Sequence, residues 1–358
     1  YVPTFDKDAG SKTTFQYLKM FLKKGYVVKF IGDNYLHEEP YTSTLQQMGI
    51  EVLYGQEYLT GIWDWLVKNG KDIHVAYLNR PHIATKYVDF IKEHTDIKMI
   101  YYGHDLHFMR EFREYELTGD VKKRQESEYW KSIEFSLFHK VAVSYYPSYV
   151  EEEAIHAVDE TIPVKAITAY VYEEFLQNLN KDFAKREGLL FVGGFAHPPN
   201  ADAVLWFAKE VFPKIREQIK VNFYIVGSKV TDEIKALEQP GNGIIVKGFV
   251  SEEELADLYR NCRIVVVPLR YGAGVKGKVV EAIYNGAPIV TTSVGSEGIP
   301  DVEKVLLVKD QPDEFAETVV ELYKDEKRLE DLAEKTQVYI REHFSIDAAW
   351  DVIKEDFE

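Results

Sequence analysis

The 358-residue sequence has little cysteine and no excess of positive charge. Its single cysteine, Cys262, excludes an internal disulfide and a zinc site built from cysteines. The formal net charge of −16 argues against general nucleic-acid binding, because no surplus of lysine or arginine is available to contact phosphates. The apolar fraction of 46% is ordinary for a globular protein, so the chain can build substantial hydrophobic cores.

Long hydrophobic runs are also lacking. No apolar run approaches the roughly 20 residues that a membrane-spanning helix needs, and no signal peptide is visible. We therefore expect a cytoplasmic protein, with peripheral association at the inner face of the membrane as the alternative. The sequence begins at Tyr1 rather than Met, which leaves open a processed form or a piece of a longer polypeptide.

Short apolar runs alternate with helical patterns along the whole chain, which indicates parallel sheets covered on both faces. The length and a charged, amide-rich stretch at 171–188 favour two domains joined by a linker. We predict two tandem doubly wound, Rossmann-like α/β domains with a deep cleft between them, at 1–170 and 189–343, and a last helix at 344–358 that packs back on the first domain. The predicted strands are 27–31, 50–53, 73–78, 99–102, 141–144, 164–167, 189–192, 223–226, 244–246, 264–268, 289–292 and 305–308.

Capping residues mark several helices of the second half. Asn200 is a suitable N-cap for a helix over 201–217, and Ser251 with Glu254 forms a capping box. Further helices are expected at 231–237, 252–260, 276–285 and 312–342.

The most informative stretch is 264–299, where an apolar run leads into the glycine-rich loop GAGVKGK of 272–278. Glycines let backbone amides approach a phosphate closely, and a following helix adds the positive pole of its dipole. Lys278 and Glu281 share one face of that helix, so a diphosphate at Lys278 would place ribose hydroxyls near Glu281. The plainer interpretation is a tight turn followed by a surface ion pair. The loop, the lysines Lys276 and Lys278, and the downstream acid together favour the binding interpretation.

This stretch resembles the donor-binding segment of glycosyltransferase family 4, the retaining nucleotide-sugar enzymes with the GT-B fold. Other segments resemble that family in the same order along the chain. They are DKDAGS at 6–11, YYGHD at 101–105, FVGG at 191–194, FYIVG at 223–227, KGFV at 247–250, GAPIV at 286–290 and GSEGI at 295–299.

The resemblance implies a role for each matching residue. Glu281 would hold the nucleotide ribose, and the backbone near Phe249 and Val250 would meet the base. His104, Lys276 and Lys278 are the expected catalytic residues. The diphosphate and the donor sugar would be contacted by residues from both domains: Gly10, Ser11, Gly193, Gly194, Gly272, Ala273, Gly274, Val275 and Glu297.

Two departures from the family pattern change where the charge comes from. Ala273 stands where many members carry a second glutamate, eight residues before Glu281. The loop at 194–200 lacks the arginine or lysine that many members carry there. Lys276 and Lys278 must therefore supply most of the positive charge for the phosphates.

Two short motifs could instead bind metal. His104 and His107 lie three residues apart, but no third ligand is marked. Residues 6–8 (DKD) match an Asp-x-Asp metal motif but follow the first strand rather than a nucleotide-binding core, so a charged loop that caps a helix is the better interpretation.

We therefore expect transfer of a sugar from a nucleoside diphosphate to a hydroxyl of a glycan, glycolipid or glycoprotein, without metal or cofactor. The N-terminal domain would bind the acceptor. A nucleotide-sugar epimerase and a non-catalytic domain of a larger glycan-assembly protein are the alternatives.

Overall fold

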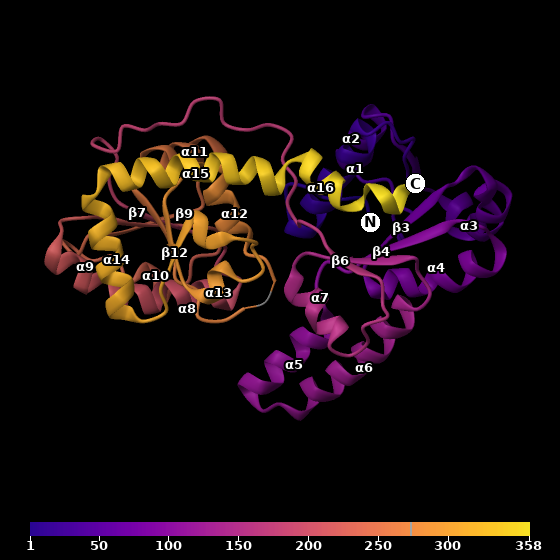
Figure 1. Cartoon of the computed structure of the whole chain (residues 1–358), viewed down its shortest axis with the longest axis horizontal. Helices are drawn as coiled ribbons and strands as arrows, with labels where there is room; N and C mark the ends of the chain where they lie inside the picture. The colour runs from indigo at the N-terminus through magenta and orange to yellow at the C-terminus, as the bar shows by residue number, and fades with distance from the viewer. Residues whose placement is uncertain (273) are drawn as a thin grey trace. The chain divides into compact units, whose positions relative to one another are not determined.

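The computed structural model describes residues 1–272 and 274–358, and of Ala9 and Leu117 only the backbone. The chain forms two compact units (Figure 1). Unit 1 comprises Tyr1–Val171 and Ile346–Glu358, and unit 2 comprises Tyr172–Ser345.

Unit 2 is built on one parallel sheet in the order β12-β11-β10-β7-β8-β9. Continuous apolar runs form its central strands, as expected for strands that are buried on both faces. Helices α11, α12 and α15 cover one face, and α8, α9 and α14 cover the other (Figure 1). The strands are β7 (Leu189–Val192), β8 (Phe223–Val226), β9 (Ile244–Gly248), β10 (Ile264–Val267), β11 (Ile289–Thr291) and β12 (Leu306–Val308).

The helices of unit 2 differ from the prediction at two places. The helix expected over 201–217 begins earlier and is interrupted by a π-helical turn, and the long helix expected at 312–342 is divided at Asp325. The helices are α8 (Pro198–Trp206), π-helical Phe207–Val211, α9 (Phe212–Gln218), α10 (Asp232–Lys235), α11 (Glu252–Asn261), α12 (Gly277–Tyr284), α13 (Ser293–Ser296), 3₁₀-helical Val302–Lys304, α14 (Pro312–Lys324) and α15 (Glu326–Phe344).

Two capping predictions have opposite outcomes. Ser251 accepts a hydrogen bond from the backbone N–H of Glu254, so the predicted cap of α11 is confirmed. Asn200 is not an N-cap, because α8 starts at Pro198 after His197. Proline suits the first helical turn, where its missing N–H has no partner to lose.

Unit 1 contains two groups of parallel strands, β1-β2 and β3-β4-β5-β6. Helix α1 covers both groups on one face. The strands are β1 (Lys29–Ile31), β2 (Glu51–Leu53), β3 (Val75–Asn79), β4 (Lys98–Tyr102), β5 (Val143–Tyr146) and β6 (Val164–Ala166). The helices are α1 (Ala9–Lys23), α2 (Tyr41–Gln47), α3 (Gln56–Asn69), 3₁₀-helical Gly70–Asp72, α4 (Pro81–His94), α5 (His107–Thr118), α6 (Val121–Phe138), α7 (Tyr149–His156), α16 (Ile346–Ile353) and 3₁₀-helical Lys354–Phe357.

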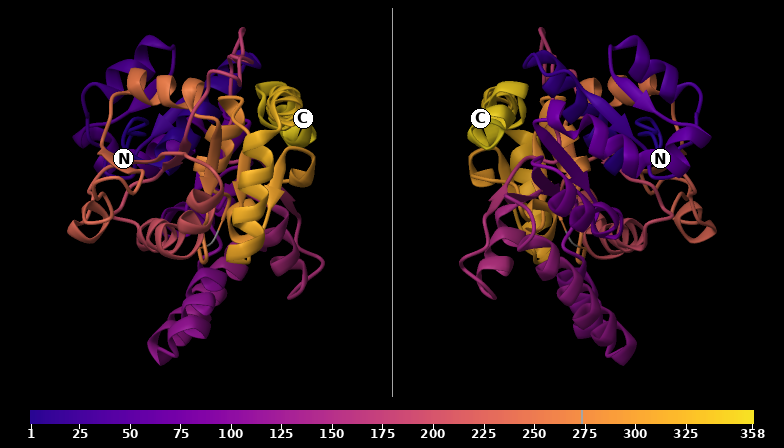
Figure 2. Two further views of the ribbon diagram at one scale, coloured as in Figure 1. Left: turned by 90° about the vertical axis from the view of Figure 1, so that its left-hand side faces the viewer. Right: turned by 90° about the vertical axis from the view of Figure 1, so that its right-hand side faces the viewer.

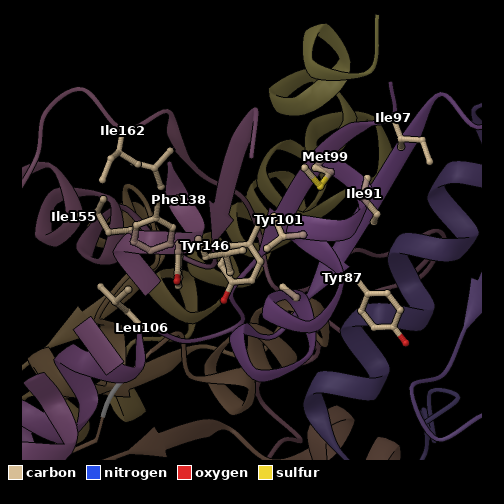
Figure 3. Packing of buried hydrophobic residues seen from close by; sticks show 14 of the residues in the cluster. Tyr87, Ile91, Ile97, Met99, Tyr101, Leu106, Phe138, Tyr146, Ile155 and Ile162 are labelled. Atoms are coloured by element: carbon tan, nitrogen blue, oxygen red, sulfur yellow. The ribbon is translucent and has the colours of Figure 1, made fainter. Parts of the chain in front are cut away.

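The opposite face of this sheet carries a large apolar core. Figure 3 shows Tyr101 of β4 and Tyr146 of β5 packed against Phe138 of α6, with Ile91 of α4 further along the sheet. All four side chains are almost fully buried.

Helices α5 and α6 pack along each other as a hairpin, which Figures 1 and 2 show extending from the rest of unit 1. The buried carboxylate of Glu134 in α6 accepts hydrogen bonds from the backbone N–H groups of His107 and Phe108. The first turn of α5 is therefore capped from the neighbouring helix, since these N–H groups lack partners within α5 itself.

Candidate functional site

The sheet of unit 2 has a topological switch point. From β7 the chain adds β8 and β9 on one side, and then β10 pairs with the other side of β7. Ligands of doubly wound sheets bind beyond the carboxyl ends of the strands at such a point. Gly193 and Gly194 follow β7 there, and the glycine loop follows β10.

The glycine loop leads directly into α12. Gly272 and Gly274 have φ values of 138° and 70°, which favour glycine over other residues. Lys276 is the N-cap of α12, not a residue of its first turn as the sequence predicted. Ala273 lies outside the described residues, and Val275 is partly buried.

Lys276 and Lys278 place two ammonium groups at this edge. Lys276 is 9% exposed, and its Nζ lies 2.5 Å from the carbonyl oxygen of Gly274 and 3.4 Å from Glu297 Oε2. Lys278 donates from Nζ to Asn200 Oδ1 at 2.5 Å and lies 5.7 Å from the ring centroid of Phe191. The two lysines are close enough for the charge of Lys276 to act on Lys278.

Asn200 is a contributor that sequence reasoning missed. Its Nδ2 donates to the carbonyl oxygen of Gly194 at 2.7 Å while its Oδ1 accepts from Lys278. A Cβ on Gly193 would lie 3.0 Å from Asn200 Nδ2 and 3.2 Å from Lys278 Cε. The glycine after β7 thus leaves room for the amide and the lysine stem.

Burial makes this cationic site unusual. Desolvation, and after it the positive charge of Lys276, lowers the pKa of Lys278 to about 8. Desolvation, followed by the charges of Lys278 and Lys276, also lowers the pKa of His197. An anion placed here would relieve the repulsion among these groups.

Helix α12 sets the direction of Lys278 and Glu281 because its other face is apolar and buried. Val279, Val280, Ala282 and Ile283 form that face. Glu281 lies one turn beyond Lys278 and is partly buried. Burial and, after it, the negative charge of Glu281 raise the pKa of Tyr259 in α11. Glu281 therefore lies on the α11 side of the site.

The remaining predicted residues of unit 2 occupy the same edge of the sheet. Glu297 follows α13 and approaches Lys276. Phe249 and Val250 follow β9, and the side chain of Phe249 is 82% exposed. A base at this position would be met by backbone and not by a buried aromatic ring.

His104 belongs to unit 1 and follows β4. Its Nε2 lies 3.1 Å from Oδ1 of Asn79, and Asn79 donates from Nδ2 to the carbonyl oxygen of Tyr77. These roles assign the ring proton to Nε2 and leave Nδ1 as an acceptor. Burial, and then the charge of Arg80, lowers the pKa of His104 to about 3.

Arg80 is the second residue that the sequence analysis missed. A Cβ on Gly10 would lie 2.5 Å from an Nη atom of Arg80, so a glycine at the start of α1 permits this approach. Arg80 and His104 have φ values of 63° and 64°, a strained backbone that is concentrated at functional sites. The Asn-Arg-Pro sequence directly after a predicted strand was the available signal.

Ser11 has a structural partner. Its backbone N–H and its hydroxyl donate to the Asp8 carboxylate at 2.8 and 2.7 Å, which caps α1. Burial opposes ionisation of Asp8, but these hydrogen bonds outweigh it and lower the pKa of Asp8. Unit 1 thus gathers Gly10, Arg80 and His104, and unit 2 gathers the lysine site.

Across 1–272 and 274–358, no group of three or more His, Cys, Asp or Glu side chains is placed to hold a metal ion. Within those same ranges, no helix is both long enough and apolar enough to cross a bilayer.

Solved structures with this architecture identify the fold. Over 97% of this chain and 92% of the other, it superimposes on sucrose-phosphate synthase from Thermosynechococcus elongatus with a TM-score of 0.66 and 15% identity. HepE from Anabaena, solved with UDP and glucose, gives 0.64 at 14% identity over 96% of this chain and 95% of that one. The chain has the GT-B fold. The predicted pair of doubly wound, Rossmann-like domains is thereby confirmed.

Part of unit 2 matches the model of a known protein family. Residues 186–325 match the family model described as glycosyl transferases group 1. The chain is also 29% identical over 184 residues to an uncharacterised 44.6 kDa protein from the cps region of Klebsiella pneumoniae. That match covers 49% of this chain and 45% of the relative, so it spans about half the length of the curated protein. The family match lies within unit 2 and covers less than half of the chain.

Proposed function

We propose that this protein transfers a glycosyl group from a nucleoside diphosphate sugar to a hydroxyl of a glycan or glycoconjugate, with retention and without a metal ion. The observation that carries the proposal is the pair Lys276 and Lys278 beside Gly193 and at the start of α12. This pair suits a diphosphate, because two ammonium groups lie beside a glycine loop and a helix N-terminus in a partly desolvated position.

The chemistry follows from where negative charge develops. The bond between the anomeric carbon and the phosphate oxygen breaks, and its electron pair stays with the diphosphate. Lys276 and Lys278 would stabilise that charge in place of a divalent cation. The acceptor hydroxyl forms the new bond to the same face of the sugar and gives its proton to the departing phosphate oxygen.

The remaining residues would hold the reactants. Glu281 would accept hydrogen bonds from the ribose hydroxyls, as acidic residues do in other doubly wound nucleotide sites. Neutral His104 would accept a hydrogen bond at Nδ1 from a sugar hydroxyl, since Nε2 is bonded to Asn79. The proposed base site is the backbone at 249–250.

The first test is calorimetry with UDP, GDP and dTDP on the wild-type chain and on Lys278→Ala. We expect one nucleotide to bind, and the variant to bind it about tenfold to a hundredfold more weakly, because a charge-assisted hydrogen bond is lost. Unchanged affinity in the variant would refute the role of Lys278. Absence of binding by any nucleoside diphosphate would refute the proposed function.

Glu281→Ala separates ribose recognition from phosphate recognition. We expect this variant to keep its affinity for inorganic diphosphate and to lose its preference for the nucleoside diphosphate. Incubation of the wild type with a labelled nucleotide sugar and acceptor glycans then distinguishes transfer from epimerisation, since only transfer places the label on the acceptor.

A further inference from the structure

Arg80 carries a positive charge that no acid of unit 1 neutralises. It directly follows β3, and its backbone N–H donates to the carbonyl oxygen of Tyr102 at the end of β4. Its side chain is partly buried, yet within 1–272 and 274–358 no hydrogen bond or ion pair reaches the guanidinium. A guanidinium has five N–H donors and stays charged, so a bound acceptor would stabilise it here.

Two helices begin beside Arg80. Arg80 is the N-cap residue of α4, and a Cβ on Gly10 in the first turn of α1 would lie 2.5 Å from one of its Nη atoms. The two helices have 14 and 15 residues, and the N-terminal end of a helix carries a partial positive charge. A cation is unfavourable at such a position, whereas an anion bound beside it would interact favourably with the guanidinium and with both helices.

The carboxylates nearest to this edge of the sheet have other partners. They are Asp8 with Ser11 and Thr4, Asp33 with Lys86, and Asp105 with Arg110. Asp8 is close enough for the charge of Arg80 to act on it, but no ion pair joins the two in the described ranges. The chain has 59 acidic and 43 basic residues, so a shortage of acids does not explain an unpaired arginine.

His104 lies at the same edge and offers a neutral acceptor. It follows β4, which pairs with β3, and the charge of Arg80 acts on its ring. Its Nε2 is bonded to Asn79, which leaves Nδ1 as the acceptor. Burial, and after it the charge of Arg80, holds the pKa of His104 at about 3, so the ring is uncharged at pH 7. The edge therefore presents one cation and one neutral acceptor.

This combination favours a sugar that carries an acidic group. The N–H groups of a guanidinium match the paired oxygens of a carboxylate or a phosphate, and hydrogen bonds between opposite charges are roughly twice as strong as neutral ones. A neutral sugar offers only hydroxyls to Arg80. A hydroxyl next to the acidic group could at the same time donate to Nδ1 of His104.

We propose that the acceptor of this protein is an acidic saccharide, whose carboxylate or phosphate binds Arg80 while a hydroxyl of the same sugar donates to His104 Nδ1. This assignment rests on the proposed function, because it names the acceptor class of that reaction. The diphosphate of the donor is assigned to Lys276 and Lys278 in unit 2, so the two anions have separate cationic sites.

The test follows the side-chain Nε–Hε signal of Arg80 in the full chain by nuclear magnetic resonance. Its absence from the spectrum of Arg80→Gln assigns the signal. The probes are methyl β-glucuronide, glucose 6-phosphate and the neutral methyl β-glucoside. The control variant is Arg124→Gln in α6, which removes the same charge from unit 1 at an exposed ion pair with Glu128.

We expect at least one charged probe to shift the Arg80 signal and to bind about tenfold or more tightly than the glucoside, because charge-assisted hydrogen bonds form. The tighter of the two charged probes identifies the acidic group. Arg80→Gln should lose the preference for a charged probe, and Arg124→Gln should keep it. A purely structural role of Arg80 would change the binding of all three probes alike.

Equal binding of the three probes, failure of both charged probes to bind, or an unchanged preference in Arg80→Gln would overturn the proposal. Displacement of the charged probes by the nucleoside diphosphate would also overturn it, since Arg80 would then serve the donor. Calorimetry with nucleoside diphosphates on the same samples tests the proposed function separately. If none binds, that function is refuted, and the preference at Arg80 is still measured.

Discussion

Lys278 combines a charge with a partly desolvated position. Its ammonium is held by one neutral acceptor, Asn200 Oδ1, and by the ring of Phe191. Neither partner neutralises it, and Lys276 adds a second positive charge nearby. A diphosphate would therefore meet an ammonium that has already lost much of its water, which strengthens the attraction.

Diphosphate affinity should fall as pH rises from 7 to 9. The pKa of Lys278 is about 8, so the free protein loses this charge within that range. The diphosphate itself gains little further charge there, since phosphate groups have a second pKa of about 6. Calorimetry with the preferred nucleoside diphosphate at several pH values measures how the affinity changes with pH.

Lys278→Arg and Asn200→Asp are the matched variants for this prediction. Arginine stays charged, so its affinity should vary less with pH. An aspartate at 200 would raise the pKa of Lys278 and weaken binding at every pH through repulsion of the diphosphate. Equal slopes for the wild type and Lys278→Arg would show that another group controls the dependence.

The charged residues of the site could be predicted from the sequence. The residues that position them by hydrogen bonds could not. Lys276, Lys278 and Glu281 are visible because a glycine loop before a helix has a known physical use. Asn200 was interpreted as a helix cap, and only the fold brings it from α8 to α12. Asn79 ends β3 and Arg80 follows it, whereas His104 follows β4, so their approach depends on the pairing of β3 with β4.

At the scale of elements, α13 is held against the sheet by close packing at one glycine. A Cβ on Gly295 would lie 2.0 Å from Thr291 Oγ1 and 3.0 Å from the carbonyl oxygen of Val267. Thr291 Oγ1 in turn donates to that carbonyl at 2.8 Å. Glu297, which approaches Lys276, directly follows this turn.

Gly295→Ala should destabilise the protein by about 1–3 kcal/mol, because an added methyl group in a packed site forces shifts of its neighbours. Gly61→Ala in α3 is the control, since a Cβ there meets nothing within 4 Å. That variant should be more stable by roughly 0.4–1 kcal/mol, and chemical denaturation measures both. Unchanged stability of the Gly295→Ala variant would contradict this account of the packing.

Strands were easier to predict than helices in this chain. The runs at 189–192 and 223–226 are apolar throughout, and both coincide with β7 and β8. Helix α5 was not predicted, because its sequence HFMREFREYELT is rich in charged residues and follows a segment that we interpreted by its histidines. The separation of the pair β1-β2 from the sheet β3-β4-β5-β6 could not be predicted either. The residues of a strand do not determine which other strand it pairs with.

At the scale of the whole molecule, unit 1 is assembled from both ends of the chain. Ile353 of α16 and Phe357 are buried, and Phe357 contacts the rings of Phe21 and Tyr26. Asp356 accepts a hydrogen bond from the hydroxyl of Tyr145 in β5. The last residues thus complete the core above α1 and the sheet.

Removal of residues 346–358 should destabilise unit 1 and leave unit 2 nearly unchanged. Each fully buried large apolar side chain contributes about 1.5–3 kcal/mol, so the loss of several should lower the melting temperature of unit 1 markedly. Calorimetry, with hydrogen exchange to assign each transition, measures the effect.

The point variants Ile353→Ala and Val352→Ala provide the comparison. Ile353 is fully buried, so Ile353→Ala should lower the free energy of unfolding of unit 1 by about 2–5 kcal/mol. Val352 is 43% exposed, so Val352→Ala should change that free energy little. Equal effects of the two, or a loss confined to unit 2, would contradict the assignment of α16 to unit 1.

This arrangement of α16 has a consequence during synthesis. A ribosome completes unit 2 before it makes residues 346–358, because Tyr172–Ser345 precede them in the sequence. Until then Phe21, Tyr26 and Tyr77 have no cover from Phe357. The first unit to be translated is therefore the last to be finished, and its uncovered aromatic face is the surface that a chaperone would meet on the nascent chain.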